Sequence, residues 1–213
     1  MKLRFLKFFR FFNFFHNFCK FLVRIHFYIF LFKLKISEKM DIIIEIAKAI
    51  WFILPAYGAN AFPPLMKGKI PIDRGKKLGK NRILGDGKTV EGTIGGIIFG
   101  FFVGLVQIFV QSKINIEPYG FVNITIPLIL TLTVGALIGD MIGSFIKRRF
   151  GIERGKPAPL LDQLDFLIFA LILSSLVVKI ETITIIILLI LTPPVHYISN
   201  VIGYFSKIKK KPY

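Results

Sequence analysis

The stretch that decides the fold is Gly139-Asp140-Met141-Ile142-Gly143-Ser144-Phe145-Ile146-Lys147-Arg148-Arg149-Phe150-Gly151, closely followed by Pro159-Leu160-Leu161-Asp162-Gln163-Leu164-Asp165-Phe166. It places three carboxylates and a cluster of cations at the junctions between very apolar segments. Charge beside lipid is costly, so ionisable residues at such junctions are functional candidates. Carboxylates close to Lys and Arg indicate a divalent metal ion and a substrate that carries phosphate. The pattern therefore predicts phosphoryl chemistry at a membrane face.

The composition predicts an all-α integral membrane protein with about five transmembrane helices. The 213-residue chain is 54% hydrophobic and has a mean hydropathy of +0.67. Several apolar runs approach the ~20 residues that a helix needs to cross a bilayer. Its one cysteine, Cys19, excludes an internal disulfide and offers no zinc-ligand pattern. The best spans are residues 42–57, 93–110, 124–142, 164–178 and 182–199.

Small residues and prolines predict how these spans pack. The second and third spans carry glycine at every fourth position, which lets helix backbones approach closely in lipid. These glycines are Gly92, Gly96, Gly100 and Gly104, then Gly135, Gly139 and Gly143. Pro193-Pro194 lies inside the fifth span and predicts a kink or a break there, because two N–H donors are missing.

The charge distribution predicts the topology. The net charge is +17, and outside residues 1–39 the basic residues gather between spans one and two, between spans three and four, and in the C-terminal tail. Basic loops stay in the cytoplasm, so we expect these two loops to share the cytoplasmic face and to form the active site there. The charge is then largely topological, and we expect no nucleic-acid partner.

Residues 1–39 fit this topology badly, because five spans with the tail inside would place this basic, Phe-rich stretch outside. It is a basic interfacial helix, or it includes a sixth span near 21–36, or it is an artefact of start-codon choice, with Met40 as the natural start. We favour the artefact. The predicted domains are therefore a doubtful extension over 1–39 and one membrane domain over 40–213.

Three acids form a candidate magnesium site. Asp140 comes late in the third span, and Asp162 and Asp165 are three apart at the start of the fourth, so they share a helix face. Taken singly, Asp162 and Asp165 also fit ordinary first-turn acids that the helix dipole stabilises. The three together beside one basic loop favour Mg²⁺, which takes carboxylate, phosphate and water oxygens.

The loop from Asn81 to Thr93 is a candidate phosphate-binding loop. Gly87-Lys88-Thr89 precedes a helix, but the full Walker spacing is absent and we expect no strand before it, so we reject a P-loop fold. Glycines such as Gly85 permit close backbone approach, and free N–H groups can meet an anion. The Lys88 ammonium adds a point charge, and the planar Arg82 guanidinium can donate two hydrogen bonds to one phosphate. The alternative is a solvated turn.

Several linked motifs resemble those of the archaeal CDP-archaeol synthases, which are relatives of the CDP-diacylglycerol synthases. The resemblance runs from Met40 to the C-terminus. The motifs are Ala59-Asn60-Ala61-Phe62-Pro63-Pro64, then Leu84-Gly85-Asp86-Gly87-Lys88-Thr89-Val90-Glu91-Gly92, then Gly139-Asp140 with Ser144, Lys147 and Arg148, then Pro159 through Phe166. Bacterial and eukaryotic relatives carry a longer signature with Pro-Gly-His-Gly-Gly before the last Asp-x-x-Asp. The segment 151–159 is shorter and has no histidine, which favours the archaeal branch.

The resemblance implies Mg²⁺-dependent transfer of CMP from CTP to an isoprenoid glyceryl ether lipid phosphate, with release of pyrophosphate, at the cell membrane. It implies catalytic roles for Asp162, Asp165, Lys147 and Arg148, and metal binding by Asp140, Asp162 and Asp165. The residues implied for the CTP phosphates are Arg82, Asp86, Gly87, Lys88, Thr89, Gly92 and Asn60. Asn60 also fits a helix-terminal cap.

Other readings of the same residues stay open. The first alternative is a CDP-diacylglycerol synthase, which carries out the same chemistry with phosphatidic acid as the acceptor. A small transporter would use the acids as an ion path, although they cluster at one face and transporter sites lie near the bilayer midplane. A membrane anchor for anionic lipids would explain the basic loops but not the three acids. The sequence predicts no oligomeric state.

Overall fold

The computed structural model describes residues 39–207, and the predictions for 1–38 lie outside the described residues. The chain divides into two units at Glu45, and only Lys39–Glu45 of the first unit is described. These residues form the beginning of helix α2, which continues into the second unit. The arrangement below is that of the second unit.

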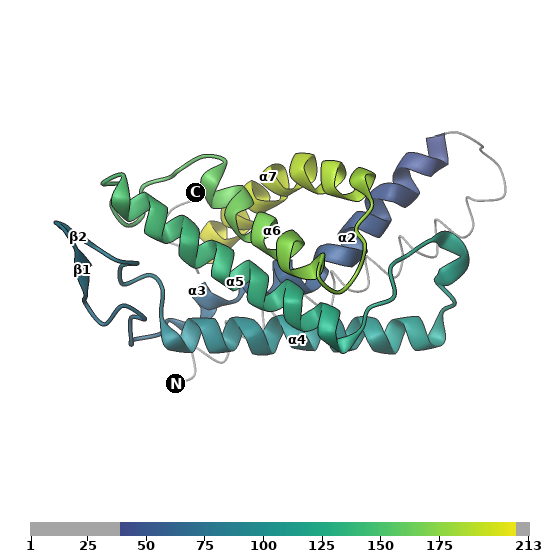
Figure 1. The fold of residues 1–213 in the computed structure, drawn as a ribbon, viewed down its shortest axis with the longest axis horizontal. Helices are drawn as coiled ribbons and strands as arrows, with labels where there is room; N and C mark the ends of the chain where they lie inside the picture. Colours follow the sequence, from purple (N-terminus) through teal and green to yellow (C-terminus); the bar gives the residue numbers. More distant parts are fainter. Residues whose placement is uncertain (1–38, 208–213) are drawn as a thin grey trace. The chain divides into compact units, whose positions relative to one another are not determined.

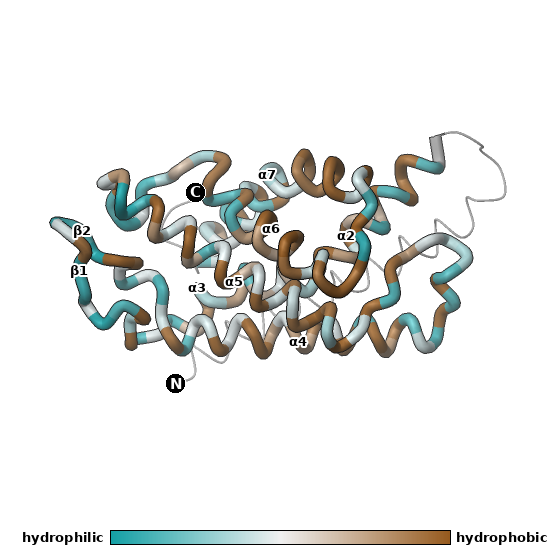
Figure 2. The backbone as a smooth tube through the Cα atoms, viewed as in Figure 1, coloured by the Kyte–Doolittle hydropathy of each residue, from teal (hydrophilic) through white to brown (hydrophobic). Residues whose placement is uncertain are grey.

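The described residues are mainly helical (Figure 1). The helices are α2 (Lys39–Ala61), α3 (Pro63–Met66), α4 (Val90–Lys113), α5 (Ile126–Arg149), α6 (Leu161–Ser174) and α7 (Thr182–Phe205), with a 3₁₀ turn, η1, at Glu117–Tyr119. Four stretches are long and apolar enough to cross a membrane: Asp41–Met66, Val90–Lys113, Ile126–Arg149 and Thr182–Phe205. Figure 2 shows the apolar residues concentrated on these helices and the polar ones on the connections. The predicted all-α membrane fold is confirmed.

The fourth predicted span is shorter than expected. Helix α6 has 14 residues, about 21 Å of helix at 1.5 Å per residue. It ends at Ser174 although the apolar run continues to Val178. The hydroxyls of Ser174 and Ser175 donate to the carbonyls of Leu171 (3.2 Å) and Ile172 (2.7 Å), and such local bonds compete with continuation of the helix.

Helix α5 is longer than expected at its C-terminus. We predicted that Lys147, Arg148 and Arg149 lie in the loop after the third span, and this is wrong, because all three belong to the last turn of α5. Cations are favourable there because the helix dipole places negative partial charge at the C-terminus. The extension keeps Lys147 on the same helix face as Asp140 and Gly143, at spacings of seven and four residues.

The predicted close packing at the glycines is confirmed. A methyl group added at Gly100 would lie 2.7 Å from the carbonyl oxygen of Pro55 on α2 and 2.5 Å from Cγ2 of Thr133 on α5. One at Gly135 would lie 2.7 Å from the carbonyl oxygen of Phe169 on α6. Helix α4 therefore packs directly on α2 and α5, and α5 packs directly on α6, as membrane helices with small residues do.

Prolines inside the helices are accommodated in two ways. Pro55 has no N–H to pair with the carbonyl of Trp51, and the Nε2 amide of Gln107 on α4 donates to that carbonyl instead, at 2.6 Å. Helix α7 continues through Pro193 and Pro194, so the predicted break does not occur.

The core between these helices is apolar and includes the buried side chains of Phe52, Leu132 and Leu167.

The connection between α3 and α4 contains strands that we did not expect. Lys77–Leu78 (β1) and Asn81–Arg82 (β2) pair as a two-stranded antiparallel hairpin. A second antiparallel bridge joins Pro71 to Thr89. The two-residue strands carry too little hydrophobic surface to form a core, and they serve to fold the connection back on itself.

Candidate active site

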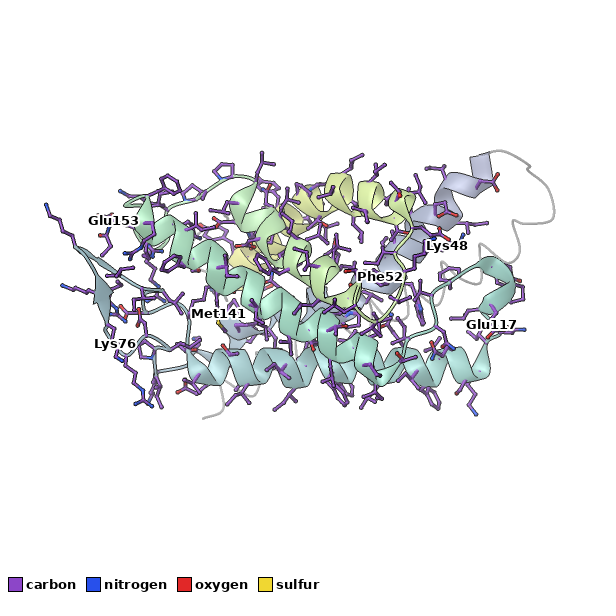
Figure 3. All side chains as sticks on the ribbon, in the orientation of Figure 1. Lys48, Phe52, Lys76, Glu117, Met141 and Glu153 are labelled. Atoms are coloured by element: carbon purple, nitrogen blue, oxygen red, sulfur yellow. The ribbon has the colours of Figure 1, made fainter. Side chains whose placement is uncertain are left out.

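The two long basic connections meet at the same end of the helices. The guanidinium of Arg149, at the end of α5, donates to the carbonyls of Leu78 (2.5 Å) and Arg82 (2.7 Å) in the β1–β2 hairpin. The Asn81 side chain donates in return to the carbonyl of Arg148, at 2.9 Å. In Figure 3, Lys76 and Glu153 label these two connections at one end, and Glu117 lies at the other. The predicted juxtaposition of the two loops is confirmed.

A buried carboxylate that sequence reasoning missed organises the first loop. The Asp73 side chain is only 1% exposed. One of its oxygens accepts from Nε of Arg82 (3.1 Å) and from the N–H groups of Leu84 (3.0 Å) and Gly85 (2.8 Å). The other accepts from Nη2 of Arg82 (2.5 Å) and from the N–H of Gly75 (3.2 Å). The Arg82 guanidinium and these amides hold the pKa of Asp73 well below its usual range.

These contacts change the picture of the loop as a set of free anion donors. The Arg82 guanidinium is engaged on both sides, because its Nη1 also pairs with the exposed Asp86 carboxylate at 2.8 Å. The N–H of Gly85, a glycine of the expected phosphate-binding loop, donates to Asp73. Arg82 and Gly85 therefore stabilise the loop itself in this structure.

The start of α4 is capped by Thr89. Thr89 has an extended backbone, and its Oγ1 accepts from the N–H of Gly92 at 3.2 Å. Glu91 in the first turn accepts from the N–H groups of Lys69 (3.0 Å) and Ile70 (3.2 Å). The cap and the Glu91 carboxylate hold the backbone next to Lys88 in place, and so fix the point from which the Lys88 side chain extends.

Two lysine–aspartate pairs join the loops to the helices. Lys88 Nζ lies 2.5 Å from Oδ2 of Asp140 on α5, with side chains 22% and 25% exposed. Lys147 on α5 pairs with Oδ1 of Asp162 in the first turn of α6, and Oδ2 of Asp162 accepts from the N–H of Ala158 at 3.0 Å. The structure thus pairs each of two expected phosphate-binding cations with an expected metal-binding acid.

The third acid is buried beside these pairs. Asp165 is 7% exposed, and its Oδ1 accepts from the N–H of Phe166 at 2.6 Å. It lies within electrostatic range of Asp140, Lys88 and Asp162. The predicted trio of carboxylates therefore forms one charged cluster at the junction of α4, α5 and α6.

The carboxylate oxygens of this cluster are of the chemical type that binds a magnesium ion. Residues 39–207 contain no group of three Asp, Glu, His or Cys side chains already arranged around one metal position. Mg²⁺ does not need such a group, because it commonly binds one or two carboxylates together with phosphate oxygens and water. In this structure, the positive charges next to Asp140 and Asp162 are the ammonium groups of Lys88 and Lys147. These carboxylates and Asp165 are the residues suited to hold the ion.

Arginines line the glycine loop. A methyl group built at Gly85 would lie 3.5 Å from Nε of Arg148, and one built at Gly87 would lie 3.5 Å from Nε of Arg154. Arg148 donates to the carbonyl of Ile152, and its buried Nε has no hydrogen-bond partner within the described part of the chain. Arg154 is exposed. Both distances are ordinary van der Waals contacts, so the two guanidinium groups lie directly beside this loop.

Not every expected residue joins the cluster. Asn60 lies in the last turn of α2, is half-buried, and belongs to neither lysine–aspartate pair. Asp86 faces outward at the loop surface and reaches only Arg82. Asp73 was missed, although the sequence held a signal for it: it is the only acid between Glu45 and Asp86 in a strongly basic stretch.

Helices of membrane-spanning length with a cluster of paired lysines and aspartates at one end define an integral membrane protein with a charged site suited to a ligand that carries phosphate. The family model "CarS-like: CDP-archaeol synthase" matches residues 40–213. The chain belongs to this family of CDP-archaeol synthases.

Individual relatives agree. The chain is 46% identical over 170 residues to the CDP-archaeol synthase of Pyrococcus horikoshii, covering 79% of this chain and 98% of the relative. It is 47% identical over 165 residues to that of Methanocaldococcus jannaschii, covering 76% and 93%. A solved structure of an intramembrane enzyme for archaeal membrane lipids biosynthesis matches with a TM-score of 0.62 and 38% identity, over 72% of this chain and 92% of the other.

Proposed function

We propose that the protein transfers the cytidylyl group of CTP to 2,3-bis-O-(geranylgeranyl)-sn-glycerol 1-phosphate, giving unsaturated CDP-archaeol and pyrophosphate. The family and the relatives named CDP-archaeol synthase support this reaction. The observation that carries the proposal is the pairing of Lys88 with Asp140 and of Lys147 with Asp162 at the junction of α4, α5 and α6. Such a cluster suits a polyanionic substrate.

The reaction needs little acid–base chemistry from the protein. An oxygen of the lipid phosphate attacks the α-phosphorus of CTP, the bond from that phosphorus to the bridging oxygen of the β-phosphate breaks, and pyrophosphate leaves with the electron pair. The attacking group is already an anion, so no side chain must remove a proton. This agrees with the absence of a histidine from the segment 151–159. Catalysis then comes from positioning and from charge neutralisation.

The lysines and arginines of the cluster bind the triphosphate. Lys88 and Lys147 exchange their aspartate partners for phosphate oxygens. Arg148 adds a hydrogen bond from its Nε–H group, which is buried and has no partner among the described residues. These cations lower the energy of negative charge on the leaving pyrophosphate. The loop glycines admit the nucleotide phosphates to the same place.

Asp140, Asp162 and Asp165 hold magnesium in this proposal. A magnesium ion held there would supply positive charge that offsets the negative charge of the phosphates and makes the reacting phosphoryl group more electrophilic. The aspartates also orient the lysines, because each pair fixes where an ammonium group lies before the nucleotide arrives.

The site faces the cytoplasm, where CTP is available. The exposed cations of the connections 67–89 and 150–160 lie at the same end as the cluster, and basic loops stay in the cytoplasm. The isoprenoid chains of the acceptor stay among the apolar helices, and its phosphate reaches the cluster from the membrane interface.

The direct test uses purified protein in detergent with Mg²⁺, α-labelled nucleoside triphosphates and digeranylgeranylglyceryl phosphate. We expect label to enter lipid from CTP alone and transfer to stop when a chelator removes the metal. A parallel reaction with phosphatidic acid tests the acceptor. Equal transfer to phosphatidic acid would show that the enzyme is not specific for the ether lipid. Folded protein that transfers no label from any nucleotide would refute the proposal.

A further inference from the structure

Helix α5 lacks a side chain at the position that the Asp165 carboxylate occupies. A methyl group built at Gly143 would overlap Oδ2 of Asp165, and would lie 2.7 Å from its Cγ and 2.9 Å from its Cβ. Real Cβ atoms essentially never approach other heavy atoms below 3.0 Å. A carboxylate in this position on α6 therefore requires glycine at 143.

The backbone of α6 has no room to withdraw. One turn earlier on α5, a methyl group at Gly139 would overlap the carbonyl oxygen of Asp165 and lie 2.8 Å from Cα of Phe166. The α5–α6 contact is thus made by backbone on both sides. Interiors packed this closely transmit a displacement and do not absorb it. A side chain at 143 would therefore move the carboxylate, because the helix that carries it is fixed.

We propose that Gly143 is a positioning residue for the transfer site: its missing side chain leaves the space in which the Asp165 carboxylate is held beside Asp140, at the junction of α5 and α6. The inference rests on the proposed function, since it gives Asp165 a place in the transfer site. Gly139 sets how closely the two backbones approach, and Gly143 sets where the carboxylate lies.

The functional test compares Gly143→Ala with Gly135→Ala. Both substitutions put a methyl group into the same α5–α6 contact, but Gly135 lies about two turns along α5 from Gly143 and meets the backbone of Phe169 and Ala170, not a carboxylate. We expect Gly143→Ala to lower kcat/KM about 100-fold, the order expected for a misplacement of about 1 Å. We expect the Mg²⁺ concentration for half-maximal activity to rise about tenfold, as for other changes that reorient metal ligands.

Gly135→Ala separates positioning from general damage to the fold. It should reduce activity in proportion to the fraction of folded protein and leave the Mg²⁺ requirement unchanged. The inference is overturned if Gly143→Ala keeps the wild-type Mg²⁺ requirement and activity within about threefold. It is also overturned if Gly135→Ala shifts the Mg²⁺ requirement as far as Gly143→Ala does.

A second variant covers the case in which Gly143→Ala does not fold. Asp165→Glu keeps the carboxylate but lengthens the side chain by one methylene, so the carboxylate leaves the position that the Asp165 carboxylate holds beside Gly143. We expect it to lower kcat/KM to a similar extent with the apparent Tm close to that of the wild type. Wild-type activity in Asp165→Glu would show that the position beside Gly143 does not matter.

A thermal measurement keeps the inference distinct from the proposed function. Gly143→Ala should lower the apparent Tm more in the wild-type protein than in an Asp165→Ala background, which lacks the overlapping atoms. Equal shifts in the two backgrounds would refute the contact, whether or not the protein transfers CMP. Non-additive shifts together with unaltered catalysis would leave the contact in place and overturn its role in positioning.

Discussion

Replacement of Asp73 by Asn should open the first loop without unfolding the helices. The carboxylate accepts five hydrogen bonds, three at one oxygen and two at the other. Asn keeps one acceptor oxygen and puts an NH₂ donor in place of the second, so at least two donors lose their acceptor in either orientation of the amide. At about 1–1.5 kcal/mol for each bond, the loop loses about 2–3 kcal/mol, which corresponds to a rise of roughly 30- to 150-fold in its opening equilibrium.

Hydrogen exchange measures this opening directly. The best reporters are the N–H groups of Ile72 and Ile83, which donate to the main-chain carbonyls of Lys88 (2.9 Å) and Lys76 (3.1 Å). Asp73→Asn does not remove these acceptors, so faster exchange at Ile72 and Ile83 reports opening of the loop. Protection of the apolar helices should be unchanged.

Asp86→Asn is the matched control for the Asp73 substitution. Asp86 contacts the same guanidinium, but its side chain is 58% exposed, and exposed pairs contribute little to stability. We expect reporter exchange in Asp86→Asn to match the wild type. The reasoning is wrong if Asp73→Asn leaves exchange unchanged, or if Asp86→Asn accelerates it equally.

The same carboxylate predicts a dependence on acid. Because folding lowers the pKa of Asp73, its contribution is fully present above the unfolded pKa of about 3.9 and is lost as the pH falls through the folded pKa. Reporter exchange, corrected for its intrinsic pH dependence, should therefore be level between about pH 5 and 8 and should rise only in stronger acid. A rise that begins near neutral pH would contradict the assignment.

Three further substitutions test the cluster and the helix packing. Asp162→Asn and Asp165→Asn should each abolish turnover without unfolding the protein, and near-normal activity of both purified variants would contradict the metal assignment. Lys88→Met should raise the KM for CTP about tenfold, the effect of removing about 1.4 kcal/mol of binding, and a KM equal to that of the wild type would remove Lys88 from the nucleotide site. Gln107→Leu should lower stability by about 1–3 kcal/mol, because the carbonyl of Trp51 loses its donor, while the Mg²⁺ dependence of transfer stays unchanged.

Sequence patterns located the helices but not all of their ends. Apolar runs of nearly membrane length follow directly from the cost of exposing backbone and polar side chains to lipid, so four long helices lie where the hydropathy placed them. The ends depend on local bonds that hydropathy ignores. Ser174 and Ser175 close α6 early, and the cations of Lys147 to Arg149 extend α5.

The candidate site was predictable as a set of residues and not as a set of contacts. Lys88, Asp140, Lys147, Asp162 and Asp165 stand out in the sequence because each is an ionisable group at the border of an apolar run. Which cation meets which acid was not readable. Asp73 is marked in the sequence as a single acid in a basic stretch, but its five donors are known only from the structure.

The sequence by itself determined that this chain forms membrane helices, that the glycines of α4 and α5 let neighbouring helices approach closely, and that the acids lie near the borders of apolar runs, because these depend on residue type and on short periodic spacing. Only the tertiary structure decided the pairings. Lys88 and Asp140 are 52 residues apart, and Gly143 meets the Asp165 carboxylate only because α5 and α6 cross at that register. Contacts between distant residues depend on the geometry of helix packing, which no local pattern encodes.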